Sequence, residues 1–210
     1  VEVGFDLGFK YRNPVMILSD GIIGQMMEKV TFGPQKERLS DEEIIKRYGS
    51  WATTGKTPDR ERNIVTSLEL KSERQEKHND KLQAKYKEIT ENEIRYEKYN
   101  CEDADYLMVA FGSTARICQK AIQLGAQKGL KIGMIRPITL WPFPMDVINE
   151  AADRVKGILT VEMNAGQMVE DVRLAVNGKT SVEFYGRYGG MIPSPGEILT
   201  ALEQKIIGGK

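Results

Sequence analysis

The fold is decided by one stretch of the sequence, Lys156-Gly157-Ile158-Leu159-Thr160-Val161-Glu162-Met163-Asn164-Ala165-Gly166-Gln167-Met168-Val169-Glu170-Asp171-Val172-Arg173. It starts with an apolar run, Ile158 to Val161, which is typical of a buried strand. After a polar corner, apolar residues return at helical spacing from Met168 onward. The stretch therefore predicts a strand, a tight turn and a helix.

The polar corner of this stretch contains Asn164, Gly166 and Gln167. The first backbone N–H groups of a helix lack partners within the helix and carry partial positive charge, so they attract a capping side chain or an anion. In open parallel sheets, ligands also bind at such corners. Two interpretations follow: Asn164 caps the helix, or the corner binds an anion with Arg116 or Arg187 nearby.

The same alternation of strand and helix continues on both sides of this stretch. The patterns predict strands at Tyr106–Phe111, Lys131–Ile135 and Ser181–Tyr185, and helices at Ala115–Lys128, Met145–Val155 and Pro195–Ile207. A turn with a capping side chain is expected at Gly112-Ser113-Thr114. Strands that alternate with helices of this length form crossover units, which give a parallel sheet with helices on both faces. The sequence from about residue 101 therefore predicts an α/β domain.

The chain before this domain has a different character. Glu2 to Tyr11 has a helical apolar stripe that Pro14 ends, and Val15 to Leu18 is wholly apolar, like a buried parallel strand. One helix and one strand do not make a domain, so this piece needs a sheet that the chain does not contain. Because the chain also opens with Val1, we expect it to be a fragment of a longer polypeptide.

Residues 36–100 are rich in charge and are predicted to connect these two parts. Ser40 and Glu43 are spaced as a capping box that starts a short helix before Gly49. Ser67 to Ile89 predicts a helix with a thin apolar stripe. Glu91 to Tyr99 predicts an exposed edge strand protected by charge.

The composition limits the classes of function. Lys plus Arg and Asp plus Glu both number 30, so net charge gives no reason to expect nucleic acid or a membrane surface as a partner. Cys101 and Cys118 are too few for an iron–sulfur cluster, a tetrahedral zinc site or a disulfide scaffold. No apolar run approaches the ~20 residues of a membrane span. We therefore expect a cytoplasmic protein whose fragment carries no catalytic residue and no metal site of its own.

Two loops are candidates for contact with other proteins. The segment Arg136 to Pro144 places Trp141 and Phe143 between prolines, and such a stiff apolar loop docks on a partner at small ordering cost. The alternative is that both aromatic side chains cover the domain's own core. The second loop, around Arg187 and Tyr188, offers a cation and an aromatic ring to a phosphate or to a neighbouring subunit.

Several stretches together resemble the α subunit of the 2-oxoacid:ferredoxin oxidoreductases, most closely the branched-chain (2-oxoisovalerate) type. The matching stretches are Lys10 to Asp20, Ile23 to Glu28, Arg136 to Pro144, Val161 to Met168 and Tyr188 to Gly190. They follow the family's order over nearly the whole chain. The resemblance implies that residues 1–35 are the tail of a thiamine-binding domain of the pyrimidine type, 36–100 a connector, and 101–210 a transketolase C-terminal-like domain.

The resemblance also implies more about fold and chemistry. The expected fold is a three-layer α/β/α arrangement with a mostly parallel five-stranded sheet and one antiparallel edge strand, a place that suits Glu91 to Tyr99. The family decarboxylates a 2-oxoacid on thiamine diphosphate, reduces ferredoxin through iron–sulfur clusters and releases an acyl-coenzyme A. The missing amino-terminal part is expected to hold the glutamate that activates the ring of thiamine diphosphate. The diphosphate and magnesium site and the iron–sulfur clusters are expected on the β and other subunits of an oligomeric complex.

We therefore expect a fragment that is inactive alone and serves architecture and docking in the complex. The alternative is a module that binds coenzyme A or another anion at Asn164, Gly166 and Gln167, with Arg116 or Arg187. A transketolase-like thiamine enzyme shares the fold, but the Arg136 to Pro144 run disfavours it.

Overall fold

The computed structural model describes residues 1–35, 37–53, 55–56 and 58–208. The chain forms two compact units. The first unit consists of Val1–Met26 together with Ala84–Lys210, and the second unit is Met27–Gln83. The sheet and the candidate site both belong to the first unit.

A five-stranded sheet forms the centre of the first unit. Its strands, in the spatial order β1-β3-β2-β4-β5, are β1 (Tyr96–Tyr99), β3 (Ile132–Pro137), β2 (Tyr106–Val109), β4 (Ile158–Glu162) and β5 (Val182–Gly186). Strand β1 runs antiparallel to β3, with Tyr96 opposite Pro137, whereas all other neighbours are parallel. The predicted mostly parallel sheet with one antiparallel edge strand is confirmed.

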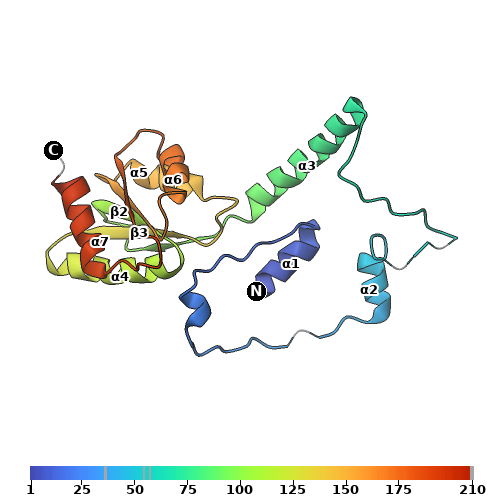
Figure 1. Cartoon of the computed structure of the whole chain (residues 1–210), viewed down its shortest axis with the longest axis horizontal. Helices are drawn as coiled ribbons and strands as arrows, with labels where there is room; N and C mark the ends of the chain where they lie inside the picture. Colours follow the sequence, from blue (N-terminus) through green and yellow to red (C-terminus); the bar gives the residue numbers. More distant parts are fainter. Residues whose placement is uncertain (36, 54, 57, 209–210) are drawn as a thin grey trace. The chain divides into compact units, whose positions relative to one another are not determined.

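Four helices cover the two faces of this sheet. They are α4 (Gly112–Gln127), α5 (Met145–Ala152), α6 (Met168–Val176) and α7 (Pro195–Leu202), and α7 continues into a π-helical turn, η2 (Glu203–Ile207). Helices α4 and α7 lie on one face, and α5 and α6 lie on the other (Figure 1). This confirms the predicted three-layer α/β/α fold.

The core follows from the alternation of side chains along the strands. On β2, Met108 packs toward α4 and α7, while its neighbours Leu107 and Val109 pack toward α5 and α6. The same holds on β4, where Leu159 and Ile158 belong to opposite layers. Full burial of such a side chain stabilises the fold by about 1.5–3 kcal/mol, which explains why strands of four to six residues suffice.

A buried carboxylate holds the amino-terminal helix against the rest of the first unit. Helix α1 (Glu2–Tyr11) ends beside Glu93, which follows helix α3 (Ser72–Asn92) and is only 5% exposed. Its Oε1 accepts hydrogen bonds from Lys10 Nζ and the Tyr11 hydroxyl, both at 2.7 Å, and its Oε2 pairs with Arg95 Nη2 at 3.0 Å. Hydrogen bonds from Lys10, Tyr11 and Arg95 lower the pKa of Glu93 to about 2 despite its burial. We call these four residues the Glu93 clasp.

The strand predicted at Val15 to Leu18 is wrong for this chain. These residues are extended but form no strand, and their side chains are 43–80% exposed. Val15 and Ile17 lie against α1 at Gly4, where an added Cβ would be 3.4 Å from Ile17 Cδ1. The physical reason is that a strand needs a neighbour, and no strand among the described residues pairs with this segment.

Three predicted element boundaries also need correction. Helix α3 runs from Ser72 to Asn92 rather than from Ser67 to Ile89. Because the helix continues past Glu91, strand β1 begins only at Tyr96. Helix α4 begins at Gly112 and has no side-chain cap at its N-cap residue, Phe111. The expected capping hydroxyls have other partners: Ser113 Oγ donates to Asp20, and Thr114 Oγ1 donates to the Phe111 carbonyl.

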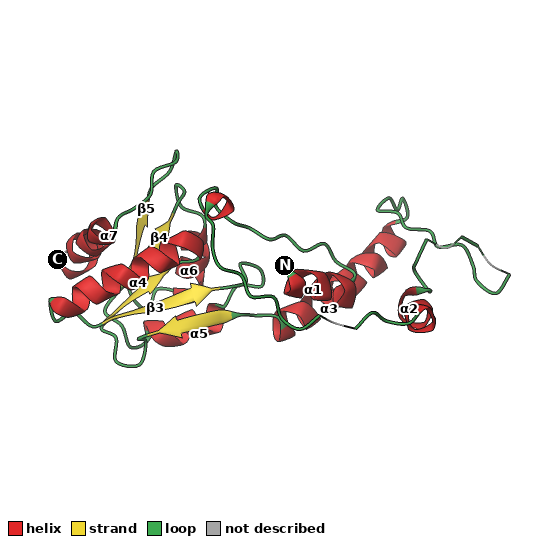
Figure 2. Cartoon of the chain, turned by 90° about the horizontal axis from the view of Figure 1, so that it is seen from below, coloured by secondary structure: helices red, strands yellow, loops and turns green. Residues whose placement is uncertain are grey.

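The second unit contains helix α2 (Asp41–Tyr48), long loop segments and the first part of helix α3, up to Gln83 (Figure 2). The predicted capping box is present, with the Glu43 N–H bonded to Ser40 Oγ and the Ser40 N–H bonded to the Glu43 carboxylate. After the helix, the Arg60 guanidinium donates to the carbonyls of Gly49, Ala52 and Gly55. No helix among the described residues has the length and apolar character that crossing a membrane requires.

Candidate functional site

The candidate site lies where the order of the sheet reverses along the chain. Strand β2 is followed by its neighbour β3, but the chain then crosses to β4 on the other side of β2. The loops after β2 and β4 therefore separate at the carboxyl edge, and the crevice between them is the usual ligand position in such sheets. A cavity of about 210 Å³ is found there.

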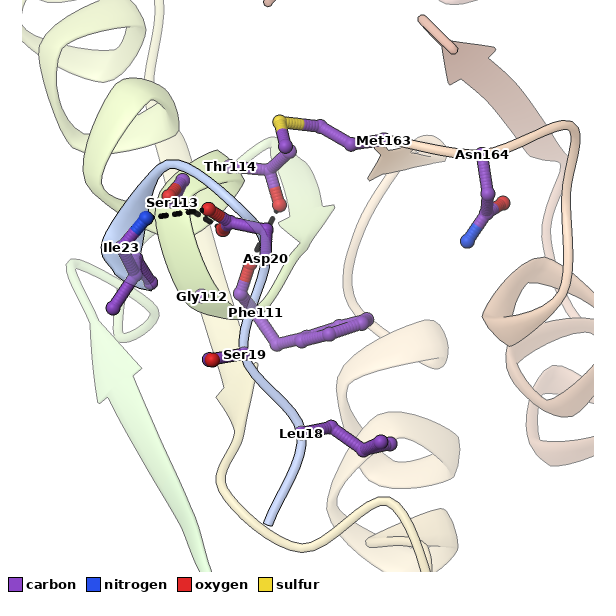
Figure 3. Close-up of a pocket in the computed structure, with 10 residues that line it drawn as sticks. All are labelled: Leu18, Ser19, Asp20, Ile23, Phe111, Gly112, Ser113, Thr114, Met163 and Asn164. Atoms are coloured by element: carbon purple, nitrogen blue, oxygen red, sulfur yellow. Dashed lines mark hydrogen bonds between the residues drawn. The ribbon is translucent and has the colours of Figure 1, made fainter. Parts of the chain in front are cut away.

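This cavity is lined by three segments (Figure 3). Residues Phe111–Thr114 follow β2, and Met163 and Asn164 follow β4. The third segment comes from the amino-terminal part of the chain and contributes Leu18, Ser19, Asp20 and Ile23. The crevice is thus closed on one side by residues that precede the sheet by some eighty positions in the sequence.

Asp20 holds this third segment against helix α4. Its Oδ2 accepts a hydrogen bond from Ser113 Oγ at 2.6 Å, and its Oδ1 accepts from the N–H groups of Ile22 and Ile23 at 3.0 and 2.9 Å (Figure 3). Partial burial raises the pKa of Asp20, but the hydrogen bonds from Ser113, Ile23 and Ile22 outweigh it and leave the pKa below its ordinary value. An ionised carboxylate therefore lies at the amino terminus of α4, where an anion is favoured.

A second carboxylate, Glu162, fills the amino terminus of helix α6. Glu162 is the last residue of β4 and is 1% exposed. Its Oε2 accepts from the Met168 N–H at 2.9 Å, its Oε1 accepts from the Val169 N–H at 3.0 Å, and both oxygens lie 3.3 Å from the Gln167 nitrogen. The first N–H groups of α6 are therefore bonded to the protein's own carboxylate.

Asn164 supports this arrangement and does not cap α6 itself. Its Nδ2 donates to Glu162 Oε2 at 3.0 Å, and its Oδ1 accepts from the Gly166 N–H at 2.7 Å. Gly166 has φ of +107°, a backbone conformation that requires glycine here. The interpretation that Asn164 caps the helix is thus corrected: the cap is Glu162, five residues before the N-cap residue Gln167.

The structure brings only part of the predicted anion site to the cavity. Asn164 lines it, whereas Gly166, Gln167, Arg116 and Arg187 are not among its lining residues. Arg187 Nη1 instead pairs with Glu197 at 2.6 Å. Anion or coenzyme A binding by these five residues remains a prediction, and an anion at the α6 terminus would have to displace the Glu162 carboxylate.

The two aromatic residues of the proline-rich loop point to different surroundings. Phe143 packs against the core layer between the sheet and helices α5 and α6. Trp141 is 58% exposed and meets the Tyr86 ring of α3 edge-on, with ring centroids 5.6 Å apart. The exposed Tyr188 lies in the loop after β5. Contact of Trp141, Phe143 and Tyr188 with other subunits remains a prediction.

Sequence reasoning missed Glu162 and the Asp20–Ser113 contact. Glu162 carries a detectable signal, because a carboxylate that ends a wholly buried run shortly before a helix needs several donors. Asp20 carries no such signal, because its partner is 93 residues away.

The acidic, histidine and cysteine side chains of the described residues are those that could ligate a metal ion. Among them, no group of three or more His, Cys, Asp or Glu side chains is arranged to hold a metal ion. Asp20, which lines the cavity, and Glu162, at the end of β4, are both bonded to N–H or O–H donors. At this edge of the sheet, the two carboxylates therefore fix the positions of the loops.

Comparison with known proteins shows which proteins this chain is similar to. Residues 104–198 match the model of the pyruvate:ferredoxin oxidoreductase core domain II. The ketoisovalerate oxidoreductase subunit VorB of Methanothermobacter thermautotrophicus is 40% identical over 201 residues, which is 95% of this chain and 54% of VorB. By sequence, the chain is similar to subunits of the 2-oxoacid:ferredoxin oxidoreductases. The expected resemblance is confirmed.

Two further proteins are similar to this chain at lower sequence identity. The 2-oxoglutarate synthase subunit KorA of Methanothermobacter marburgensis is 31% identical over 94% of this chain and 58% of KorA. A solved 2-oxoglutarate:ferredoxin oxidoreductase from Magnetococcus marinus, with 2-oxoglutarate, coenzyme A and succinyl-CoA bound, has a TM-score of 0.60 at 23% identity. That match covers 74% of this chain and 28% of the other, and it shows a shared fold. The chain spans about half the length of the VorB and KorA relatives.

Proposed function

We propose that this chain is part of the α subunit of a 2-oxoacid:ferredoxin oxidoreductase of the branched-chain type. The complex would oxidatively decarboxylate a 2-oxoacid to an acyl-coenzyme A and reduce ferredoxin. The observation that carries the proposal is the 40% identity to VorB over 95% of the chain. Within the complex, the first unit serves architecture and subunit docking.

The filled helix termini support the architectural role. Ligands in α/β sheets bind where helix N–H groups are open to them. Here Glu162 and Asp20 supply carboxylates at the amino termini of α6 and α4. We therefore assign thiamine diphosphate, magnesium and the iron–sulfur clusters to other parts of a cytoplasmic, oligomeric complex that includes a β subunit and delivers electrons to ferredoxin.

Reconstitution tests this proposal. The full chain is assayed for reduction of ferredoxin by 2-oxoisovalerate with thiamine diphosphate and coenzyme A, alone and after assembly with the other parts of a VorB-containing complex. We expect no turnover by the chain alone and turnover by the assembly. Turnover by the isolated chain, or an assembly that is equally active without it, would contradict the proposal.

Titration calorimetry separates this role from the coenzyme A alternative. If the Asn164–Gln167 corner is architectural, the chain takes up no coenzyme A, and Gln167→Ala changes nothing in the titration. Heat of binding that is lost in Gln167→Ala would instead assign the ligand to this corner.

A further inference from the structure

A second cavity lies at the amino edge of the sheet, where β2 and β3 begin, and has a volume of about 510 Å³. It is bordered by the loop from β1 to β2, by the end of α4 and by the start of β3. Small-molecule sites typically have volumes of about 300–1,000 Å³. This cavity, which we call the amino-edge cavity, therefore has room for a small ligand.

The floor of the amino-edge cavity is apolar. Ile122 of α4 and Ile132 of β3 both line it and belong to the buried core. Leu130 packs against the same core, and Ala126 lies at the exposed end of α4. An aliphatic group placed on this floor would lose contact with water, which favours binding.

The loop that forms the polar side of the cavity is held in place. The carbonyl oxygen of Asn100 approaches β3 so closely that a Cβ added at Gly133 would lie 2.8 Å from it. The Asp105 N–H donates to the Lys131 carbonyl at 2.9 Å, and the Lys156 N–H donates to the Asp105 carbonyl at 2.7 Å. A loop that is already ordered costs little conformational entropy when a ligand binds to it.

Four charged side chains line this polar side, and two of them pair with each other. Lys131 Nζ lies 3.4 Å from Asp103 Oδ2. Within the part of the chain that the structure describes, Lys98 and Glu102 form no ion pair, and Lys98 Nζ lies 6.0 Å from the centre of the Tyr96 ring. One cation and one anion that lack a partner of opposite charge therefore border the same apolar floor.

We propose that the amino-edge cavity binds a free aliphatic α-amino acid, with its carboxylate at Lys98, its ammonium group at Glu102 and its side chain on the apolar floor. A ligand with a single charge would leave Lys98 or Glu102 without a partner. A ligand with a charged side chain would place that charge against buried carbon atoms, which is unfavourable. A zwitterion with an apolar side chain matches all three parts of the cavity.

The narrower choice of a branched-chain amino acid rests on the proposed function. Such an amino acid differs from a branched-chain 2-oxoacid only in carrying an amino group and a hydrogen atom in place of the oxo group. The cavity would then bind the aminated counterpart of the oxoacid that the complex consumes. The site itself rests on Lys98, Glu102 and the floor between them.

Titration calorimetry of the full chain tests this inference with L-valine and L-leucine as probes. We expect saturable binding of both. 2-Oxoisovalerate lacks the ammonium group and isobutylamine lacks the carboxylate, so each should bind about threefold more weakly or worse, as expected when a partly exposed ion pair is lost. Absence of saturable binding of both amino acids, or equally tight binding of either analogue, would overturn the inference.

Matched variants locate the site. Lys98→Gln and Glu102→Gln each remove one charge at an exposed position, and each should weaken L-valine binding about threefold. Ala126→Phe fills the cavity and should abolish binding, whereas Gln127→Phe, at the next exposed position and outside the lining, leaves binding unchanged. L-Valine binding that is the same in all four variants would overturn the assignment to this cavity.

Alkylation of Cys101 provides a second readout. Burial raises the pKa of this thiol, which lines the cavity, whereas Cys118 is 0% exposed. We expect L-valine to slow the reaction of Cys101 with N-ethylmaleimide in the native chain and to have no effect in Ala126→Phe. An unchanged rate in the native chain would contradict the site. The proposed function fails independently, through the ferredoxin assay, because that assay does not measure amino acid binding.

Discussion

Glu162 is a buried carboxylate that links the end of β4 to the first turn of α6. Three backbone N–H groups and the Asn164 amide donate to it. An unsatisfied buried donor costs about 1–3 kcal/mol. Glu162 therefore stabilises the chain by accepting hydrogen bonds from these donors, and its removal would leave the donors unsatisfied.

We expect Glu162→Ala to lower the free energy of unfolding by about 3 kcal/mol, because several buried donors lose their acceptor at once. Urea denaturation followed by circular dichroism measures this difference. Glu170→Ala is the control, since Glu170 is exposed in the first turn of the same helix. A loss no larger than that of the control would show that the N–H groups of α6 find other acceptors.

Thr160 shows the opposite case, a buried hydroxyl without a partner. The residue is 0% exposed, and its Oγ1 has no hydrogen-bond partner among the described residues. We expect Thr160→Val, which keeps the shape and removes the hydroxyl, to stabilise the chain by about 1 kcal/mol. Thermal and urea unfolding measure the change.

The matched control for Thr160 is Thr114→Val. Thr114 is also buried, at 4% exposed, but its hydroxyl donates to the Phe111 carbonyl at 2.6 Å. The same substitution should therefore destabilise the chain. If both variants shift stability in the same direction, the hydroxyl of Thr160 has a partner in solution.

At the scale of elements, the strands and helices after residue 101 were predictable because each has a clear hydrophobic period and a glycine or proline boundary. Val15–Leu18 has an equally clear pattern but forms no strand, because no strand among the described residues pairs with it. The role of Asp20 could not be predicted, because its partner Ser113 is 93 residues away. Glu162 carries a local signal, because its donors follow within seven residues. The local hydrophobic pattern thus predicts the secondary-structure elements, whereas contacts between distant segments determine which side chains lie in the crevice.

The Glu93 clasp predicts how the attachment of α1 responds to pH. Lys10, Tyr11 and Arg95 lower the folded-state pKa of Glu93 to about 2, whereas an unfolded glutamate titrates near 4.3, roughly. The clasp therefore contributes fully above the unfolded pKa, and its contribution is lost as pH falls from there toward the folded pKa. We expect stability to fall over this window.

Urea unfolding between pH 7 and pH 2 checks the clasp. Glu93→Gln should be less stable than the native chain at pH 7 and should show a shallower decline below pH 5. Glu97→Gln is the control, because Glu97 pairs with Arg136 at 2.7 Å but is 57% exposed, where ion pairs contribute little. Parallel pH profiles for the native chain and Glu93→Gln would contradict the clasp.

At the scale of the whole molecule, the division into two units predicts that the first unit folds without the second. The sheet, its four helices and the Glu93 clasp all lie within Val1–Met26 and Ala84–Lys210. We expect a variant in which a long Gly/Ser linker replaces Met27–Gln83 to keep a cooperative thermal transition. Circular dichroism and calorimetry measure it. Loss of cooperativity would show that the second unit stabilises the first.

The corner formed by Glu162, Asn164 and Gly166 bears on how other sequences of this kind are interpreted. The side chains of Glu162 and Asn164 in the Glu-Met-Asn-x-Gly-Gln run bond within this corner and to the first turn of α6. We therefore expect a sequence that contains this run to turn from a strand into a helix at that position. We expect the run to indicate how the chain folds at this corner, and we expect the residues that select a substrate to lie at other positions.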